Sequence, residues 1–273
     1  MTGTLLSNGI RAAADQLLQA AATGVPCAPV RQLLPEQSVE IGYAVQSTLT
    51  RARLAQARRV TGRKIGLTAA AVQAQLGVDR PDFGVLFDDM ACGEDEPIAI
   101  ERLLQPRIEA EIAFVLGADL AGEDIDTASA RAAVAVVVPA LEIVDSRIAG
   151  WDITIVDTIA DNASSGLYVL GPAYGPLGDI DLTTVEMTLV DGEGDTVSTG
   201  TGADCLGDPV AALVWLARTA YELGEPLRAG EVVLSGALGP MVPVRPGASY
   251  TATLSGLGTV HAAFTAPTTG GRA

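Results

Sequence analysis

Two glutamates stand one residue apart in an otherwise apolar run that extends from Arg107 to Gly117. Side chains of an extended strand alternate between its faces, so Glu109 and Glu111 would project from one face, about 7 Å apart along the backbone. One interpretation is a half-buried antiparallel strand whose acidic face meets water. The other is a divalent cation site, because hard cations are bound by carboxylate oxygens that converge from one surface. This run alone leaves both interpretations open.

A third carboxylate, Glu142, ends an apolar segment that begins near Ala132. A carboxylate in a segment of this kind is costly to bury without a partner. Glu142 is therefore a candidate third ligand, and three carboxylates would form a negative site suited to Mg²⁺ or Mn²⁺. The alternative is an ion pair with an arginine such as Arg147.

Lys64 is the only lysine among the 17 cationic side chains, and the others are all arginine. A chain with this bias is expected to use arginine wherever a permanent surface charge suffices. Lysine is a compact donor whose pKa falls on desolvation, whereas guanidinium stays charged. Lys64 is thus a candidate for chemistry that arginine cannot perform, and an exposed lysine without a role is the alternative.

Composition narrows the class of protein. The 273 residues carry a formal net charge of -16, which disfavours nucleic acid and anionic membrane surfaces as partners. Three separated cysteines, Cys27, Cys92 and Cys205, indicate neither a disulfide framework nor a thiolate zinc site. No signal-peptide order and no apolar stretch of bilayer length is present, so a cytoplasmic location is expected.

The elements that must position these side chains fall into two expected regions. Residues 1–78 are expected to be a helical N-terminal region, because apolar residues recur at three- and four-residue spacing over 8–23 and 38–60. A short strand is expected from Arg63 to Leu67. Thr68 is a candidate N-cap of a further helix that would end at Gly77.

Residues 79–267 are expected to form a β-rich metal-binding catalytic domain, which makes the fold class α+β. Residues 79–84 have the composition of a loop. Short apolar runs then follow at strand length, over 107–116, 134–144, 166–170, 183–190, 232–235, 250–254 and 259–264. One helix is expected among them, from Asp208 to Leu223, because Asp208 and Pro209 suit its first turn. Residues 268–273 are expected to be a flexible tail.

Five motifs occur in one order: G-R-K-I-G-L-T at 62–68, P-D-F-G-V-L at 81–86, R-I-E-A-E at 107–111, A-L-E-I at 140–143 and D-T-I-A-D-N-A-S at 157–164. In this order the chain resembles the 2-oxopent-4-enoate hydratase and 4-oxalocrotonate decarboxylase group of the fumarylacetoacetate hydrolase superfamily. The similarity covers residues 41 to 264. The run S-G-A-L-G-P-M-V at 235–242 is most similar to the hydratase branch.

The resemblance implies a β-rich roll and a divalent metal, Mg²⁺ or Mn²⁺, held by Glu109, Glu111 and Glu142. It also places the catalytic lysine and aspartate of the family on Lys64 and Asp82. It further implies a homo-oligomer that acts on 2-hydroxydienoates formed by aromatic ring cleavage.

Four further residues are candidates for binding the substrate. Arg107 would share the face of the glutamates, where it either steers an anionic substrate or balances their charge. Ser164 and Ser165 are candidate hydrogen-bond donors, although a loop or a helix cap explains them equally well. Asp161 is a candidate for orienting its neighbours.

The histidine content bears on the type of reaction. The carbon–carbon hydrolases of the superfamily resemble one another in pairing a histidine with an acid to activate water. The only histidine here, His261, stands in an expected C-terminal strand without a matching motif, so a structural role is favoured. Hydrolysis by that route is disfavoured.

The resemblance thus predicts a hydratase that adds water to a 2-hydroxy-2,4-dienoate and forms a 4-hydroxy-2-oxoacid. A metal-dependent 2-oxo-3-enedioate decarboxylase is the nearest alternative, and it would need a cation such as Arg63 or Arg245 near the second carboxylate. A third possibility is a non-catalytic subunit that assembles with a pathway enzyme such as an aldolase.

Overall fold

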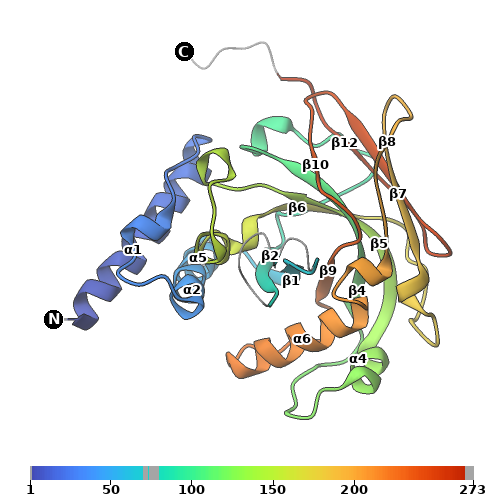
Figure 1. The fold of residues 1–273 in the computed structure, drawn as a ribbon, viewed down its shortest axis with the longest axis horizontal. Coiled ribbons are helices and arrows are strands. Elements are labelled where there is room, and N and C mark those ends of the chain that lie inside the picture. The colour runs from blue at the N-terminus through green and yellow to red at the C-terminus, as the bar shows by residue number, and fades with distance from the viewer. Residues whose placement is uncertain (1, 70–72, 74–79, 268–273) are drawn as a thin grey trace.

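The computed structural model describes residues 2–69, 73 and 80–267 and is drawn in Figure 1. The N-terminal half contains α1 (Thr2–Thr23), η1 (Val30–Leu33), α2 (Val39–Ala55), β1 (Val60–Gly66), β2 (Asp82–Phe87), β3 (Ala91–Cys92), η2 (Ile100–Arg102), β4 (Arg107–Leu116), α4 (Thr127–Ala133) and β5 (Val134–Val144). The remainder contains η3 (Ala149–Trp151), α5 (Ile155–Ala160), η4 (Asn162–Ser164), β6 (Ser165–Leu170), η5 (Leu182–Thr184), β7 (Glu186–Asp191), β8 (Thr196–Thr201), η6 (Gly202–Asp204), α6 (Pro209–Glu222), β9 (Val232–Ala237), β10 (Val242–Pro243), β11 (Ser249–Leu254) and β12 (Gly258–Ala263). Helices therefore precede a mostly β body, which confirms the expected α+β class.

The β body consists of two sheets. The larger sheet has the strand order β2-β1-β9-β4-β5-β6-β3, with β10 paired to β4, and the smaller has the order β12-β11-β7-β8. The main apolar core contains residues of both sheets, and the even-numbered side chains of β4 from Ile108 to Phe114 belong to it. Because side chains alternate along a strand, the glutamates of β4 project from the opposite face of the sheet.

A second apolar core joins the N-terminal helices to the β body. Leu17 of α1, Val45 of α2 and Val156 of α5 are buried in it. Figure 1 shows these three helices together on one side of the sheets. The arrangement fixes α5 and the turn that follows it beside β1 and β2.

The helix expected over residues 38–60 is shorter in the structure. It begins after Ser38, whose side chain accepts a hydrogen bond from Ile41 N, and it ends at Ala55. Ala57 has φ +62°, a left-handed conformation that typically ends a helix. Val60 then starts β1 instead of ending the helix, because it pairs with Phe87 of β2.

The prediction of a loop over residues 79–84 is wrong for residues 82–84. Asp82 to Gly84 open β2, which pairs antiparallel with β1 and is buried along its whole length. Pairing with β1 overrides the loop composition of the P-D-F-G run, since propensity is weaker than tertiary context. The β body was expected to contain a single helix, from Asp208 to Leu223, but α4 and α5 are present as well.

The division of the chain at residue 78 remains a prediction. β1 lies N-terminal to that boundary, yet it stands between β2 and β9 in the larger sheet. The helix expected from Thr68 to Gly77 and the tail expected at 268–273 lie largely or wholly outside the described residues.

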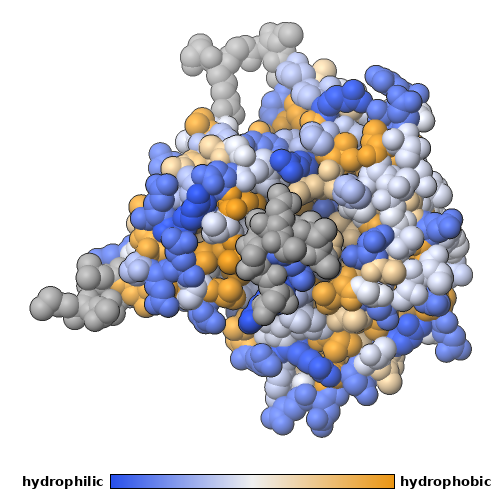
Figure 2. Space-filling view, viewed as in Figure 1, coloured by the Kyte–Doolittle hydropathy of each residue, from blue (hydrophilic) through white to orange (hydrophobic). Residues whose placement is uncertain are grey.

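Figure 2 shows hydrophilic residues interspersed with smaller apolar groups over one face of the molecule. Within the described ranges, none of the helices combines the length and the apolar character needed to cross a bilayer. Cys27, Cys92 and Cys205 are free thiols in the structure.

Candidate active site

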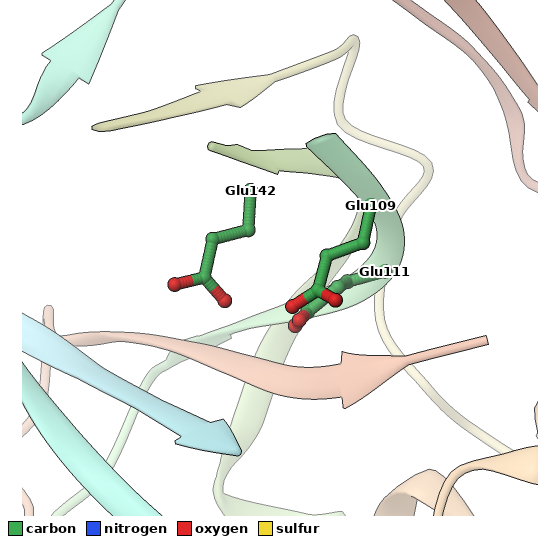
Figure 3. A group of neighbouring side chains, drawn as sticks. All are labelled: Glu109, Glu111 and Glu142. Atoms are coloured by element: carbon green, nitrogen blue, oxygen red, sulfur yellow. The ribbon is translucent and has the colours of Figure 1, made fainter. Parts of the chain in front are cut away.

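The pairing of β4 with β5 brings three carboxylates together. The register places Glu109 directly opposite Glu142, and Glu111 follows two residues along the same face of β4. One carboxylate oxygen from each of the three lies within 4.8 Å of the others. Figure 3 shows the three side chains directed into one space from two neighbouring strands.

Burial rules out the interpretation of β4 as a strand with a water-facing acidic side. Glu111 is 0% and Glu142 1% exposed, and Glu109 is half-buried. Like charges directly opposite each other on a sheet are destabilising. The arrangement is therefore one that a bound cation would stabilise.

The hydrogen bonds of the three glutamates leave room for such an ion. Glu111 Oε2 accepts a hydrogen bond of 2.8 Å from the backbone N–H of Gly236. Glu111 Oε1 and Glu142 Oε2 are buried and have no hydrogen-bond partner among the described residues. Buried polar atoms are normally paired, so the all-oxygen donor set and these two unpaired atoms fit a hard divalent cation.

The pKa values of Glu109 and Glu111 reflect the burial of several carboxylates close together. Burial, assisted by the charge of Glu142, raises the pKa of Glu109 to about 7. Burial together with the Glu142 and Glu109 charges raises the pKa of Glu111 well above its usual value. Without a cation, the site therefore favours protons on its carboxylates.

Lys64 of β1 lies beside this cluster and is 2% exposed, so the interpretation as an exposed lysine is wrong. Its Nζ lies 3.1 Å from Glu142 Oε1 and donates a hydrogen bond of 3.1 Å to Ala163 O. Burial by itself would lower the pKa of Lys64, but the charges of Glu142 and Glu109 raise it. The ammonium form is therefore favoured.

The predicted alternative for Glu142, an ion pair with Arg147, is also wrong. Glu142 pairs with Lys64, whereas Arg147 Nε contacts Asp161 Oδ1 at 2.5 Å. Lys64 thus neutralises Glu142, and Arg147 neutralises Asp161.

Asp82 stands at the start of β2, opposite Gly66 of β1. Its Oδ2 accepts a hydrogen bond of 3.4 Å from Thr158 Oγ1, and its buried Oδ1 has no hydrogen-bond partner within the described part of the chain. Burial, opposed by the charge of Lys64, raises the pKa of Asp82 to about 6. A carboxyl group with this pKa exchanges a proton readily near neutral pH.

The bare backbone of Gly66 leaves space for this carboxylate. A Cβ at Gly66 would lie 2.3 Å from Asp82 Oδ1. Any side chain at this glycine of the G-R-K-I-G-L-T motif would therefore displace the Asp82 carboxylate, a role that was not expected from the sequence.

The predicted substrate residues Ser164 and Ser165 belong to the turn between α5 and β6. Ser164 Oγ is buried without a hydrogen-bond partner among the described residues. Ser165 Oγ donates to Asn162 O at 2.8 Å. Ser164 thus retains a hydroxyl for a ligand, whereas the hydroxyl of Ser165 is engaged in the turn.

The other two predicted substrate residues have protein partners. Asp161 accepts hydrogen bonds from Ser146 Oγ and from the backbone and side chain of Arg147. The guanidinium of Arg107 lies over the ring of Trp151, 4.5 Å from its centroid. Among the described residues, Arg107 forms no ion pair with Glu109 or Glu111, which both follow it on β4.

Two residues that support the site were missed by the sequence analysis. Asn162 binds the backbone of Val85 twice, accepting from its N–H at 2.7 Å and donating to its carbonyl at 2.9 Å. Thr158 contacts Asp82. Both stand in the D-T-I-A-D-N-A-S motif, which was the available signal.

His261 lies on β12 in the smaller sheet, outside the carboxylate cluster. Its Nδ1 is 3.0 Å from Thr251 Oγ1, and its backbone N–H donates to Glu94. This placement agrees with the structural role that the sequence favoured.

Comparisons with known proteins agree with an active site at this cluster of carboxylates. A 2-keto-4-pentenoate hydratase of Paraburkholderia xenovorans (strain LB400) is 55% identical over 253 residues, which cover 92% of this chain and 93% of the relative. A 2-hydroxyhexa-2,4-dienoate hydratase of Comamonas testosteroni is 39% identical, with coverage of 92% and 96%. These relatives confirm the expected class of enzyme, a hydro-lyase with a small-molecule substrate.

The solved structure of 4-oxalocrotonate decarboxylase from Pseudomonas putida G7, complexed with magnesium and adipate, has 32% identity and a TM-score of 0.89, and the match covers 97% of this chain and 98% of that one. Its magnesium supports a divalent metal ion as the cofactor. Residues 50–265 match the family described as fumarylacetoacetate (FAA) hydrolase, C-terminal. The chain therefore belongs to the fumarylacetoacetate hydrolase family.

Proposed function

We propose that the chain is a divalent-metal-dependent hydratase that adds water to a 2-hydroxy-2,4-dienoate of the 2-oxopent-4-enoate type, and that it acts in aromatic catabolism. The product would be a 4-hydroxy-2-oxoacid. The observation that carries this proposal is the buried cluster of three carboxylates beside the single lysine, in a chain 55% identical to a 2-keto-4-pentenoate hydratase.

Glu109, Glu111 and Glu142 would hold Mg²⁺ or Mn²⁺. When bound, the ion supplies Lewis-acid stabilisation of an enolate. The unpaired buried oxygens of Glu111 and Glu142 support this assignment. Titration of metal-free protein with each ion, followed by calorimetry, distinguishes the preferred one.

Lys64 is the proposed donor to negative charge that develops on a substrate oxygen. Its position at 3.1 Å from Glu142 Oε1 places the ammonium beside the ligand cluster. Because its pKa is raised by the surrounding carboxylates, Lys64 stays protonated at neutral pH and is poorly suited to act as a base.

Asp82 is the proposed group that exchanges protons with water. Its pKa of about 6 and the unpaired Oδ1 support this role. In the proposed reaction the dienol loses its 2-hydroxyl proton and gains a proton at its terminal carbon, C5, which gives a 2-oxo-3-enoate. Water then adds at C4: Asp82 accepts one proton of that water, and C3 gains a proton as the 2-oxo group is restored, so one water molecule is added in total.

Ser164 is the proposed hydrogen-bond donor to the substrate carboxylate, because its buried hydroxyl is not used by the turn that contains it. The contacts of Asp161, Ser165 and Arg107 support structural roles for these three residues instead. A Ser164→Ala variant would test the assignment through an increase in KM.

A metal-dependent decarboxylase of 2-oxo-3-enedioates is the second candidate, because the magnesium-bound solved relative is a 4-oxalocrotonate decarboxylase. The two arginines considered for a second substrate carboxylate have other partners. Arg63 faces Glu225 and Glu231 at 3.6 and 3.7 Å, and Arg245 pairs with Asp191. These contacts favour the hydratase.

One experiment separates these candidates. Purified protein with Mg²⁺ is incubated with 2-hydroxypenta-2,4-dienoate and, separately, with 2-oxohex-3-enedioate. Loss of the dienoate ultraviolet absorbance with formation of the hydroxy-oxoacid is expected. Release of CO₂ from the diacid without hydration of the dienoate would contradict the proposed function, and no turnover of either would favour a non-catalytic partner subunit.

Three further properties are part of the proposal. A homo-oligomer is expected, and light scattering on the purified protein measures its mass. Association with a pathway aldolase would be detected by co-purification of the two proteins at defined concentrations. A cytoplasmic location is supported by the free cysteines and is tested by cell fractionation.

A further inference from the structure

We propose that Arg147 is a positioning residue for the reaction, and that it acts on Lys64 and Ser164 through the turn formed by residues 161–165. The inference rests on the proposed function, because that function gives Lys64 and Ser164 their roles. Arg147 itself contacts neither the three glutamates nor Lys64 among the contacts of the described residues.

The Arg147 guanidinium joins the two ends of this turn. Its Nη2 donates to Asp161 O at the start of the turn, and its Nη1 donates to Ser165 O at the end, at 2.6 Å. Nη1 also donates to Asp145 O at 2.5 Å, and Nε contacts the Asp161 carboxylate. One side chain thus connects the end of β5 to both ends of the turn.

The turn between these ends has an unfavourable backbone conformation. Asn162, Ala163 and Ser164 have φ values of +55°, +50° and +52°, and none of them is glycine. Three successive non-glycine residues in the left-handed region persist only when surrounding contacts enforce them. The Asn162 side chain provides some of these contacts at β2, and Arg147 provides those at the two ends.

The enforced conformation directs two groups toward the site. Ala163 O accepts a hydrogen bond from Lys64 Nζ at 3.1 Å, and the Ser164 hydroxyl is buried without a partner within the described ranges. If the turn relaxed, the carbonyl would move away from the ammonium. The glutamates stand on β4 and β5 outside the turn, so their ability to bind a metal ion would be retained.

A cavity beside Arg147 makes this role testable by chemical rescue. The cavity has a volume of about 340 Å³ and is lined by Arg147, Asp161 and Asn162 on one side and by apolar side chains of α1 and α2, including Leu17 and Leu49, on the other. A guanidinium ion is small enough to enter a cavity of this volume. It can therefore occupy the space left by truncation of Arg147.

Two variants and one control test the inference. Arg147→Ala removes the guanidinium, and Arg147→Lys keeps the charge but cannot bind both ends of the turn in the same way. Arg131 is the matched control, because it is also half-buried and its Nη2 donates to two backbone carbonyls, those of Gly178 and Ile180, away from the site. Each protein is measured for kcat, KM and Mn²⁺ affinity, with and without guanidinium chloride at millimolar concentration.

A further readout does not depend on turnover. Because Lys64 is the only lysine in the chain, the rate at which an amine reagent modifies it can be followed by mass spectrometry of a single peptide. Loss of the turn contact should expose Lys64 and increase this rate. Arg131→Ala should leave the rate unchanged.

We expect Arg147→Ala and Arg147→Lys to lower kcat by about 100-fold, which is typical of a small misplacement of a reacting group. The Mn²⁺ affinity should match that of the wild type, and guanidinium, but not sodium at equal ionic strength, should restore part of the kcat of Arg147→Ala. An active wild-type protein whose Arg147 variants keep full kcat would overturn the inference. A loss of kcat accompanied by equal loss of Mn²⁺ binding, without rescue, would also overturn it.

The experiment gives a different result if the proposed hydratase function itself is wrong. In that case the wild-type protein is inactive on both substrates, while the modification rate of Lys64 still reports on the turn. An unchanged rate in Arg147→Ala would then refute the positioning role independently of any activity.

Discussion

Within the described part of the chain, two clusters of three acidic residues bring their oxygens close together, and the two differ in burial and in hydrogen bonding. Glu109, Glu111 and Glu142 form one, on β4 and β5, and the other lies at the β7–β8 hairpin with Asp191, Glu193 and Asp195. In both clusters, one oxygen from each residue lies within 4.8 Å of the others. Proximity alone therefore does not distinguish them.

The hairpin cluster is already satisfied by the protein and by solvent. Asp191 Oδ1 accepts hydrogen bonds from the backbone N–H groups of Glu193 and Asp195, and its Oδ2 pairs with Arg245. Glu193 and Asp195 are exposed to water. This cluster is explained as the hydrogen-bonded turn of a hairpin.

The β4–β5 cluster lacks such compensation. Glu111 Oε1 and Glu142 Oε2 are buried without a hydrogen-bond partner among the described residues, and Lys64 supplies a single positive charge for three carboxylates. Burial and unpaired oxygens, rather than acidic spacing, therefore favour the β4–β5 cluster as the proposed cation site. Five predictions test this difference.

The largest effect is expected from removal of a carboxylate of the β4–β5 cluster. Glu111→Gln should abolish high-affinity Mn²⁺ binding and lower kcat by roughly 10³-fold or more, because the Lewis acid is lost. Calorimetry and the dienoate assay measure both quantities. Glu193→Gln in the hairpin is the matched control and should change neither; a metal-binding defect in this control would contradict the comparison.

Removal of the neighbouring cation should separate metal binding from chemistry. Lys64→Met should lower kcat by about 10² to 10³-fold, because a donor to the developing negative charge is lost. Mn²⁺ should still bind, and more tightly, since a competing positive charge has been removed from Glu142. Arg245→Met, which removes the cation of the hairpin, should leave kcat and Mn²⁺ affinity unchanged. Weaker Mn²⁺ binding in Lys64→Met would argue that the lysine orients the ligands.

The β4–β5 cluster should also respond to pH. The raised pKa of Glu109, about 7 against an ordinary value of 4.5, means that the folded metal-free protein binds this proton more tightly than the unfolded chain does. This contribution to stability is fully present below pH 4.5 and is lost as the pH rises through about 7. Thermal unfolding of metal-free wild type and of Glu109→Gln between pH 5 and 8 should therefore show a steeper decline with rising pH in the wild type.

Metal affinity should change in the opposite direction. Protons and Mn²⁺ compete for the same carboxylates, so Mn²⁺ affinity should increase as the pH rises toward and past 7. Calorimetric titration of the metal-free protein with Mn²⁺, repeated at several pH values and at fixed ionic strength, provides the measurement. A pH-independent affinity would contradict the assignment of Glu109 as a ligand.

The sequence predicted that Glu109, Glu111 and Glu142 lie together better than it predicted the residues around them. Alternation along a strand was sufficient to place Glu109 and Glu111 on one face, because that periodicity is local. The position of Glu142 opposite Glu109 depends on the register between β4 and β5, which alternation cannot supply. Glu142 was grouped with the other two glutamates because a carboxylate in an apolar segment needs a partner and because the family resemblance implied it.

The turn of residues 161–165 shows where local reasoning fails. Nothing in the composition of Asn162, Ala163 and Ser164 marks three successive left-handed residues, since glycine is the usual signal. Their conformation is set by Arg147 and by β2, which are distant contacts. Asp82 was assigned to a loop for the same reason: its strand exists because β1 lies beside it.

The smallest effect is expected at the hairpin, where the acidic residues have a structural role. Asp191→Asn should lower the free energy of unfolding by about 1 kcal/mol, because the side chain keeps an acceptor for the two backbone N–H groups and loses only its charge. The ion pair contributes little, since the Arg245 side chain is 59% exposed and solvent screens it. Urea unfolding measures the change, and kcat and Mn²⁺ affinity should equal those of the wild type. If the free energy of unfolding of Asp191→Asn fell by several kcal/mol, the hairpin would depend on the charge of Asp191. The two clusters would then differ only in degree.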